Sequence, residues 1–257
     1  MILTADIGNT NICFALHEDD APEPLFFERI HTDREKTALE YTVDINIVLN
    51  LHGVSPSEIT AAAVSSVVPA VTGSLRQAME SLLTCNVLEI SGALDLGFEN
   101  LTDDPMSVGN DILCDISGAL HEFEPPIITF DMGTATVATI IDRTPALSGV
   151  LITAGVRTGM NSLTKKAAAL TAVTLDAPER SIGKNTVDAM KSGLIYGNAG
   201  LLDGIIDRIE EETKEHYNVV ATGGLSSLIV PYASHAIHLD PTLLMKGMWH
   251  ILKRNIN

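Results

Sequence analysis

Apolar residues in the first half of the chain occur in short runs that are separated by polar turns. Residues 2–6 and 12–16 lie on either side of such a turn, which predicts a β-hairpin. The next apolar runs have the period of strands or of amphipathic helices. They predict, in order, a strand at 26–31, a helix at 37–51, a strand at 61–67, a helix at 70–83 after Pro69, a strand at 86–90 and a helix that Ser107 can cap and that runs to about Phe123.

The same pattern then starts again. Residues 127–131 form an apolar run that ends in a carboxylate, a polar turn follows, and residues 137–141 and 150–153 are the next apolar runs. Both halves therefore open with a strand, an Asp-x-Gly turn and a second strand. Such a duplication predicts two similar α/β lobes whose acidic turns face each other across a cleft. Two prolines end the helix before the second half, so we place an N-terminal lobe at residues 1–123 and a C-terminal lobe at residues 124–257.

A long helix is predicted at residues 186–213, and it carries an unusual row of glycines. Gly193, Gly197, Gly200 and Gly204 recur at spacings of three or four, which places them along one side of the helix. Each costs roughly 1 kcal/mol of helix propensity relative to alanine, so another chain segment should approach this side closely. Tight packing against the lobe's own sheet is the first interpretation, and a subunit interface is the alternative.

Composition and charge restrict the classes of function. The chain has 257 residues, with 16 Lys and Arg against 33 Asp and Glu, and its net charge of −17 argues against general nucleic-acid or membrane-surface binding. Three scattered cysteines do not make a disulfide framework, and no signal peptide is recognisable, which together favour the cytoplasm. The longest stretch without charge, residues 217–239, contains glycines, a proline and histidines, so we expect a strand, a glycine turn and a helix there rather than a membrane span.

The two Asp-x-Gly turns are the strongest candidates for chemistry. A glycine-containing turn can direct backbone N–H groups at phosphate oxygens, and a neighbouring aspartate can hold a hydrated Mg²⁺. One such turn, at residues 6–10, is weak evidence, but a second at residues 131–136 allows a polyphosphate to be held from both sides. Gly223 and Gly224 stand where a strand meets a helix, a geometry that suits the close approach of a nucleotide.

Taken together, the motifs of the chain resemble those of the type III pantothenate kinases, which belong to the acetate-kinase, hsp70 and actin superfamily. The resemblance covers almost the whole chain in order. It rests on residues 6–10 (DIGNT), 32–34 (TDR), 65–69 (SSVVP), 105–111 (PMSVGND), 131–136 (DMGTAT), 183–186 (GKNT) and 221–225 (ATGGL).

The resemblance implies a fold of two RNase H-like, actin-like ATPase lobes with a nucleotide cleft between them. It further implies an ATP-dependent kinase that converts pantothenate to 4'-phosphopantothenate, the first step of coenzyme A biosynthesis, and a homodimer in which Thr186 of one subunit reaches the acceptor site of the other. Asp111 is then the catalytic base, with Gly109 beside the substrate. By the same resemblance, Asp6 is the Mg²⁺ ligand and Asp131 lies near a monovalent cation, K⁺ or NH₄⁺. The adenine of ATP lies near Gly223 and Gly224. Its phosphates are held by Gly8, Asn9, Thr10, Gly133 and Thr134.

The chain departs from the family pattern on the acceptor side. The family has a tyrosine and an arginine where this sequence has Thr102 and Ile112. A guanidinium can donate two parallel hydrogen bonds to the carboxylate of pantothenate, whereas isoleucine offers neither a positive charge nor a hydrogen-bond donor. Two alternatives to pantothenate kinase activity therefore stay open: a nucleotide-binding dimeric paralogue without that activity, and a kinase for a different small alcohol.

Overall fold

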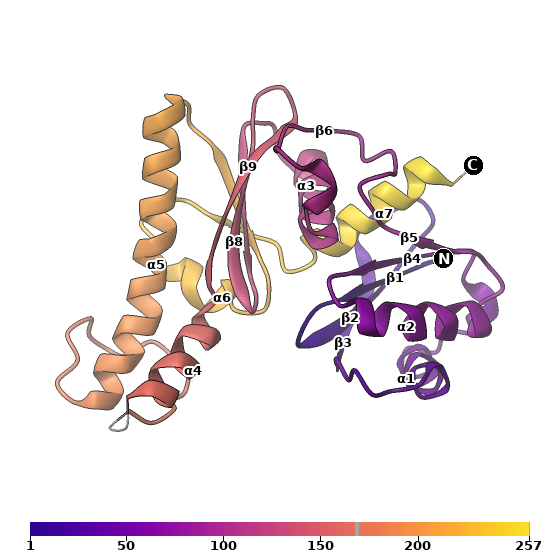
Figure 1. The fold of residues 1–257 in the computed structure, drawn as a ribbon, viewed down its shortest axis with the longest axis horizontal. Coiled ribbons are helices and arrows are strands. Elements are labelled where there is room, and N and C mark those ends of the chain that lie inside the picture. The colour runs from indigo at the N-terminus through magenta and orange to yellow at the C-terminus, as the bar shows by residue number, and fades with distance from the viewer. Residues whose placement is uncertain (168–169, 257) are drawn as a thin grey trace. The chain divides into compact units, whose positions relative to one another are not determined.

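The computed structural model describes residues 1–167 and 170–256, and these form two compact units. Unit 1 comprises Met1–His121 together with the C-terminal segment that starts at Thr242, and unit 2 comprises Glu122–Pro241. Each unit is built on one mixed β-sheet with helices packed on it (Figure 1).

In unit 1 the sheet has the strand order β3-β2-β1-β4-β5. The first three strands form an antiparallel meander, and β1 then pairs in parallel with β4, which pairs in parallel with β5. The elements are β1 (Ile2–Ile7), β2 (Asn11–His17), β3 (Pro24–His31), α1 (Ala38–Leu51), η1 (Pro56–Glu58), β4 (Ala61–Ser66), α2 (Pro69–Leu82), β5 (Val87–Glu89), β6 (Glu99–Asn100), η2 (Pro105–Ser107), α3 (Asn110–Glu122) and α7 (Leu243–Asn255).

Unit 2 repeats this connectivity. Its strands run in the order β9-β8-β7-β10-β11, with an antiparallel meander β7-β8-β9 and parallel pairs from β7 to β10 and from β10 to β11. The duplication predicted from the sequence is thus confirmed strand by strand. The elements are β7 (Ile127–Met132), β8 (Ala135–Ile141), β9 (Ala146–Ala154), α4 (Val156–Lys166), α5 (Thr186–Thr213), β10 (Asn218–Thr222), α6 (Ser226–Ile229), η3 (Val230–Tyr232) and β11 (His238–Leu239).

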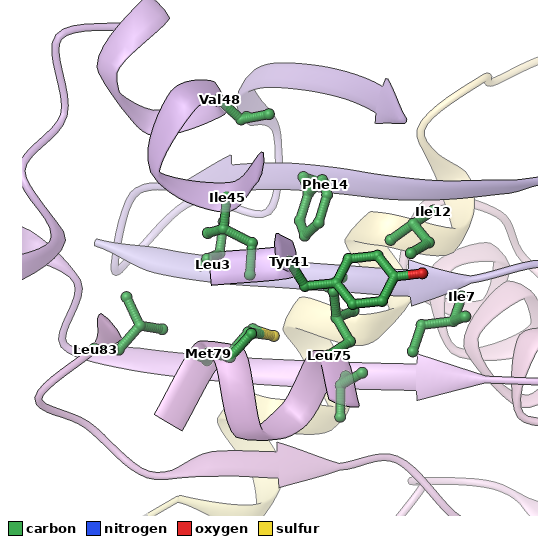
Figure 2. Packing of buried hydrophobic residues seen from close by; sticks show 14 of the residues in the cluster. Leu3, Ile7, Ile12, Phe14, Tyr41, Ile45, Val48, Leu75, Met79 and Leu83 are labelled. Atoms are coloured by element: carbon green, nitrogen blue, oxygen red, sulfur yellow. The ribbon is translucent and has the colours of Figure 1, made fainter. Parts of the chain in front are cut away.

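Helices α1 and α2 lie side by side and cover one face of the unit 1 sheet (Figure 1). Thr37 begins α1 with a capping box, because its hydroxyl accepts the Glu40 N–H and Glu40 accepts the Thr37 N–H. Figure 2 shows Tyr41 and Ile45 of α1 turned toward Phe14 of the sheet. The second sheet is covered in a similar way by α4, α5 and α6. Both phosphate-turn candidates therefore extend from strands that are anchored in a packed core.

The last helix, α7, belongs to unit 1 and not to the second lobe, where the sequence analysis placed it. We had placed residues 124–257 in the second lobe, but α7 packs on the other face of the first sheet together with α3. The reason is a close helix crossing, since a Cβ on Gly118 of α3 would overlap the backbone of Leu243, and one on Gly247 of α7 would overlap the backbone of Cys114. Two glycines at one crossing let the helix backbones approach directly.

Two further expectations are corrected by the structure. Ser107 does not cap α3, because it ends the short helix η2 with its hydroxyl bonded to the Asp104 carbonyl, and α3 begins only at Asn110. The glycines of α5 do not pack against their own sheet, since a Cβ on Gly193, Gly197 or Gly200 would meet nothing within 4 Å. Within the described ranges, no helix is long and apolar enough to cross a membrane.

Candidate functional site

The first candidate phosphate turn joins β1 to β2 and is closed by its own backbone. The Gly8 N–H donates to the Asn11 carbonyl at 3.0 Å, and a Cβ on Gly8 would lie 3.1 Å from that oxygen. Thr32, at the end of β3, holds the turn from behind, because its hydroxyl donates to the Gly8 carbonyl at 2.7 Å and its N–H to the Thr10 carbonyl at 3.0 Å. Asn9 and Thr10 are left exposed at the tip, as a turn that meets a ligand requires.

Asp6 is the last carboxylate of β1 before this turn, and it is almost buried. The parallel register places Asp6 beside Ser65 of β4, whose hydroxyl donates to Asp6 Oδ1 at 2.9 Å. The side chain is 9% exposed. A hydrogen bond to one carboxylate oxygen fixes the orientation of the other, which is the arrangement that a metal ligand needs.

Asp111 stands in the first turn of α3, and the residue before the helix is shaped around it. A Cβ on Gly109 would overlap Asp111 Oδ1, so only glycine leaves room for the carboxylate in this position. The same oxygen accepts the Ile112 N–H at 2.9 Å. Burial raises the pKa of Asp111, and the backbone hydrogen bonds oppose that shift. The carboxyl therefore binds a proton more readily than an ordinary aspartate, as a general base requires.

Asp6 and Asp111 both act on the pKa of one buried thiol. Cys114 lies one turn after Asp111 on α3, and burial raises the pKa of its thiol well above the usual range. The negative charges of Asp6, Asp115 and Asp111 raise that pKa further, so all three carboxylates lie within electrostatic range of this thiol. The fold thus gathers in unit 1 the two acidic residues that the sequence assigned to metal binding and to base catalysis.

The second candidate phosphate turn joins β7 to β8 in unit 2. The Gly133 N–H donates to the Ala135 carbonyl at 2.9 Å, which closes the turn. The start of α4 holds it, because the Gly155 N–H donates to the Thr134 carbonyl at 3.1 Å and the Thr158 hydroxyl donates to the same oxygen at 2.7 Å. The sequence alone did not predict that this helix supports the turn.

Gly223 lies against the aspartate of the second turn. The register of β7 and β10 pairs Asp131 with Thr222, so the following glycine reaches the strand end. Gly223 has φ +86°, and a Cβ there would lie 2.5 Å from Asp131 Oδ1 and 2.6 Å from the Met132 nitrogen. Both the backbone conformation and the space therefore require glycine here. The structure brings together Gly223 and Asp131, which the sequence linked only through the resemblance.

Thr186 begins the long helix α5 and is exposed. Asn185 caps this helix, because its side-chain oxygen accepts the Asp188 N–H at 2.9 Å. The preceding Gly183 packs directly on the first turn, where a Cβ would overlap Ala189. The GKNT segment is therefore a helix start with a tight approach, and it leaves Thr186 on the surface of unit 2.

Thr102 and Ile112, which stand where the family has a tyrosine and an arginine, interact with residues close to them in the chain. The Thr102 hydroxyl donates to the Asn100 side chain at 2.7 Å, and Ile112 is half-buried beside Asp111 at the start of α3.

The structure adds Arg34 to the candidate site, a residue to which we had assigned no role. Its guanidinium donates to the Asn9 side chain at 3.4 Å and so brings a positive charge to the first phosphate turn. The only signal in the sequence was its place in the 32–34 motif.

Comparison with solved structures gives the fold. A putative Baf family transcriptional activator from Campylobacter jejuni has a TM-score of 0.58 at 19% identity, covering 98% of this chain and 97% of that one. Component A of (R)-2-hydroxyglutaryl-CoA dehydratase from Acidaminococcus fermentans has a TM-score of 0.55 at 13% identity, covering 98% and 95%. At these identities the likeness concerns the fold, and the fold is that of the actin-like ATPases and kinases.

Comparison of sequences gives the family. The model of the type III pantothenate kinases matches residues 2–208. A type III pantothenate kinase from Acidiphilium cryptum (strain JF-5) is 34% identical over 255 residues, which cover 99% of this chain and 95% of that one. The chain belongs to the type III pantothenate kinase family, and it is a kinase of that family, whose reaction is the ATP-dependent phosphorylation of pantothenate in coenzyme A biosynthesis.

The family reaction uses ATP and a divalent metal, and the residues of unit 1 fit a magnesium ion. In the part of the chain that the structure describes, no group of three His, Cys, Asp or Glu side chains could hold a metal by itself. Mg²⁺ in kinases is usually bound by one or two carboxylates together with phosphate oxygens and waters. A single oriented carboxylate such as Asp6, beside a turn whose Asn9 and Thr10 are exposed, suits that mode of binding.

Proposed function

We propose that Asp111 is the base that accepts the proton of the pantothenate hydroxyl and that Asp6 holds the magnesium of ATP. The assignment is supported by the presence of both carboxylates in unit 1, where the Ser65 hydroxyl orients Asp6 and the Ile112 N–H orients Asp111. Phosphoryl transfer depends mainly on positioning and on the neutralisation of charge. One metal-binding carboxylate and one proton-accepting carboxylate in the same unit meet both needs.

We assign the phosphates of ATP to the turns that contain Gly8, Asn9 and Thr10 in unit 1 and Gly133 and Thr134 in unit 2. Each turn is closed by a glycine N–H and supported from behind through its carbonyl oxygens, which leaves its tip to meet a ligand. The adenine is assigned to the neighbourhood of Gly223 and Gly224. The bound magnesium would neutralise the charge that develops on the transferred phosphoryl group.

The monovalent cation of the family is assigned to Asp131, next to Gly223. The support is the close approach of this glycine, which keeps the Asp131 carboxylate at the end of β7. ATPase measurements in K⁺, NH₄⁺, Na⁺ and choline salts test the assignment, because a true site raises the rate in K⁺ or NH₄⁺ and Asp131→Asn removes the difference.

We propose a cytoplasmic homodimer that forms through α5. The support is the exposed row of Gly193, Gly197 and Gly200, which faces open space and permits two helices to approach closely. Thr186 begins the same helix, and the resemblance to the family implies that this residue of one subunit reaches the acceptor site of the other. Light scattering should give at least two chains per particle, and Gly197→Leu should lower that number. A monomer at tens of micromolar contradicts the proposal.

A kinase for a less anionic alcohol, or a paralogue that only binds nucleotide, is the second candidate. It is favoured by Ile112, because the position beside Asp111 offers no cation for the carboxylate of pantothenate. In either alternative the phosphate turns would still bind Mg-ATP.

A coupled assay of ADP release separates these functions. With pantothenate as acceptor, we expect turnover that Asp111→Asn abolishes while Mg-ATP binding, measured by calorimetry, stays within twofold of the native value. No turnover with pantothenate but turnover with a neutral primary alcohol would favour the second kinase. Binding of Mg-ATP with no turnover on any alcohol would favour the paralogue.

A further inference from the structure

Arg34 differs from the other positively charged side chains of unit 1. That unit contains seven Lys and Arg residues. Six of them contact a carboxylate, a carbonyl oxygen or an aromatic ring: Arg29, Lys36, Arg76, Lys246, Lys253 and Arg254. Within the described ranges, Arg34 forms no ion pair, and its hydrogen-bond partner is the neutral side chain of Asn9. Its positive charge is therefore left without a local counter-charge.

The loop between β3 and α1 carries Arg34 and is fastened to the first phosphate turn, residues 8–10. Thr32, two residues before Arg34, bonds to this turn through both its hydroxyl and its N–H. The buried Tyr41 of α1 holds the next residue, because its hydroxyl donates to the Asp33 carbonyl. Figure 2 shows this hydroxyl pointing to the ends of β1 and β2 from which the turn extends. The side chain of Arg34 thus starts from backbone that is anchored beside the turn.

Two other charged side chains of this loop are engaged away from the turn. Asp33 Oδ1 accepts the Glu35 N–H at 2.9 Å. Lys36 pairs with Asp44 of α1 at 2.7 Å, and this hydrogen bond raises the pKa of the lysine. The charge of Lys36 is therefore compensated on α1, whereas the exposed Arg34 directs its charge to the tip of the turn.

The contact with Arg34 also orients the amide at the tip of the turn. A guanidinium has five N–H donors and no acceptor, so it can face only the oxygen end of an amide. Arg34 donates to Asn9 Oδ1 at 3.4 Å, which leaves the NH₂ group of Asn9 for a ligand. Both exposed side chains then present hydrogen-bond donors, and donors that include a positive charge suit a phosphate.

We propose that Arg34 binds the terminal phosphate of ATP and neutralises part of the charge on the phosphoryl group that is transferred. The inference rests on the function proposed above, in which the turn of residues 8–10 holds phosphate and Asp111 accepts the hydroxyl proton. Turn and base belong to the same unit. The phosphoryl group under attack must lie next to the acceptor hydroxyl, so we assign the terminal phosphate to this turn.

The transfer itself needs donors but no proton from Arg34. A bond forms between the acceptor oxygen and the terminal phosphorus while the bond from that phosphorus to the bridging oxygen of ADP breaks. ADP keeps the electron pair of the broken bond, and the hydroxyl proton passes to Asp111. The N–H groups of Arg34 donate to the equatorial oxygens, over which the charge of the transition state is spread. A guanidinium can bind two such oxygens at once.

Calorimetry with two nucleotides tests the inference. Arg34→Gln removes the charge at an exposed position, so the variant should fold as the native protein does. It should weaken the binding of Mg-ATP about ten- to a hundredfold, the usual effect of one charge-assisted hydrogen bond. The binding of Mg-ADP, which lacks the terminal phosphate, should weaken by less than about threefold. Equal losses for the two nucleotides, or no loss, would overturn the inference.

Lys36→Gln is the matched control. It removes the same charge from the same loop, but at a lysine that Asp44 already pairs with, so Mg-ATP binding should stay within about twofold of the native value. Equal weakening by Lys36→Gln and Arg34→Gln would assign both effects to net charge and overturn the inference. A loss of Mg-ATP binding in Asp6→Asn, with none in Arg34→Gln, would overturn the role of Arg34 alone. A native protein that binds no Mg-ATP would overturn the proposed function as well.

A double-mutant cycle with Asn9→Ala separates direct contact from an effect through the amide. If Arg34 only orients Asn9, Arg34→Gln has no further effect once the amide is gone. Direct contact with the phosphate predicts a further loss of at least about fivefold, both in Mg-ATP affinity and in kcat of ADP release, when Arg34→Gln is added to Asn9→Ala. A loss that vanishes in the Asn9→Ala background would contradict binding of the phosphate by Arg34.

Discussion

One methyl group at Gly109 is a sharp test of the role of Asp111. In Gly109→Ala the new Cβ would overlap Asp111 Oδ1, and the nearest relief is movement of the carboxylate, because it is the end of a side chain rather than backbone. The carboxylate must move by roughly 1 Å to reach an ordinary contact. A displacement of about 1 Å at a reacting group can lower the rate by about 10²-fold, or nearly 3 kcal/mol of activation free energy.

The same movement costs little stability. It weakens the hydrogen bond from the Ile112 N–H, which is worth about 1 kcal/mol, so the melting temperature should fall by only about 2–4 °C for a chain of this size. Steady-state kinetics and thermal melting measure the two effects separately. The expected result is therefore a large loss of kcat in a protein that remains folded and still binds Mg-ATP.

Gly73→Ala is the matched control. Gly73 is exposed in the middle of α2, and a Cβ there would meet nothing within 4 Å. It should gain about 0.5–1 kcal/mol of stability from helix propensity and keep its kcat. If kcat of Gly109→Ala stays within twofold of this control, Asp111 does not act from the position that the structure gives it.

Three other changes test the metal site, the second turn and the acid response. Asp6→Asn should weaken binding of Mg-ATP at least tenfold more than binding of ATP without magnesium, and calorimetry that shows equal losses would remove Asp6 from the metal site. Gly223→Ala should cost about 1–3 kcal/mol in the free energy of unfolding, because it adds a Cβ at φ +86° against backbone, and an unchanged urea midpoint would contradict this. Burial lowers the pKa of His17 from 6.5 to about 4, so the folded protein favours the neutral imidazole. The stability that depends on the neutral imidazole is fully present above pH 6.5. It is lost as the pH falls toward 4, by about 3 kcal/mol in total. Urea titrations at pH 7.5 and 4.5 should show this loss, and His17→Gln should reduce it.

The strands could be predicted from the sequence because their signals are local. Runs of apolar residues that end in Asp-x-Gly turns occur twice, and the structure confirms both hairpins and the helix at 186–213. The glycines at 8 and 223 were also visible as turn residues, although only the register of the parallel strands shows that Gly223 lies against Asp131.

The parts that could not be predicted depend on contacts between distant segments. The assignment of α7 to unit 1 follows from Gly118 and Gly247 at a helix crossing, and nothing in the local pattern of either helix indicates the other. Likewise the open glycine row of α5 resembles a packed face, because glycines suit close packing within one chain and between two chains equally well. Sequence spacing identifies such a face but not what covers it.

The replacement of an arginine by Ile112 should affect substrate binding and proton transfer in opposite directions. A guanidinium beside Asp111 would lower the pKa of the carboxyl, whereas burial without one raises it above the usual value near 3.8. The native protein therefore has the stronger base, but it lacks a charge-assisted bond worth about 1.5–3 kcal/mol, or roughly ten- to a hundredfold in affinity for the pantothenate carboxylate. Ile112→Arg, alone or with Thr102→Tyr, should lower KM for pantothenate and move the acid limb of the kcat profile to lower pH, because less proton then binds Asp111. Ile112→Leu is the control that changes shape without charge. A native KM in the low micromolar range that Ile112→Arg worsens, with the acid limb unmoved, would show that a different cation, such as Arg157, already meets the carboxylate.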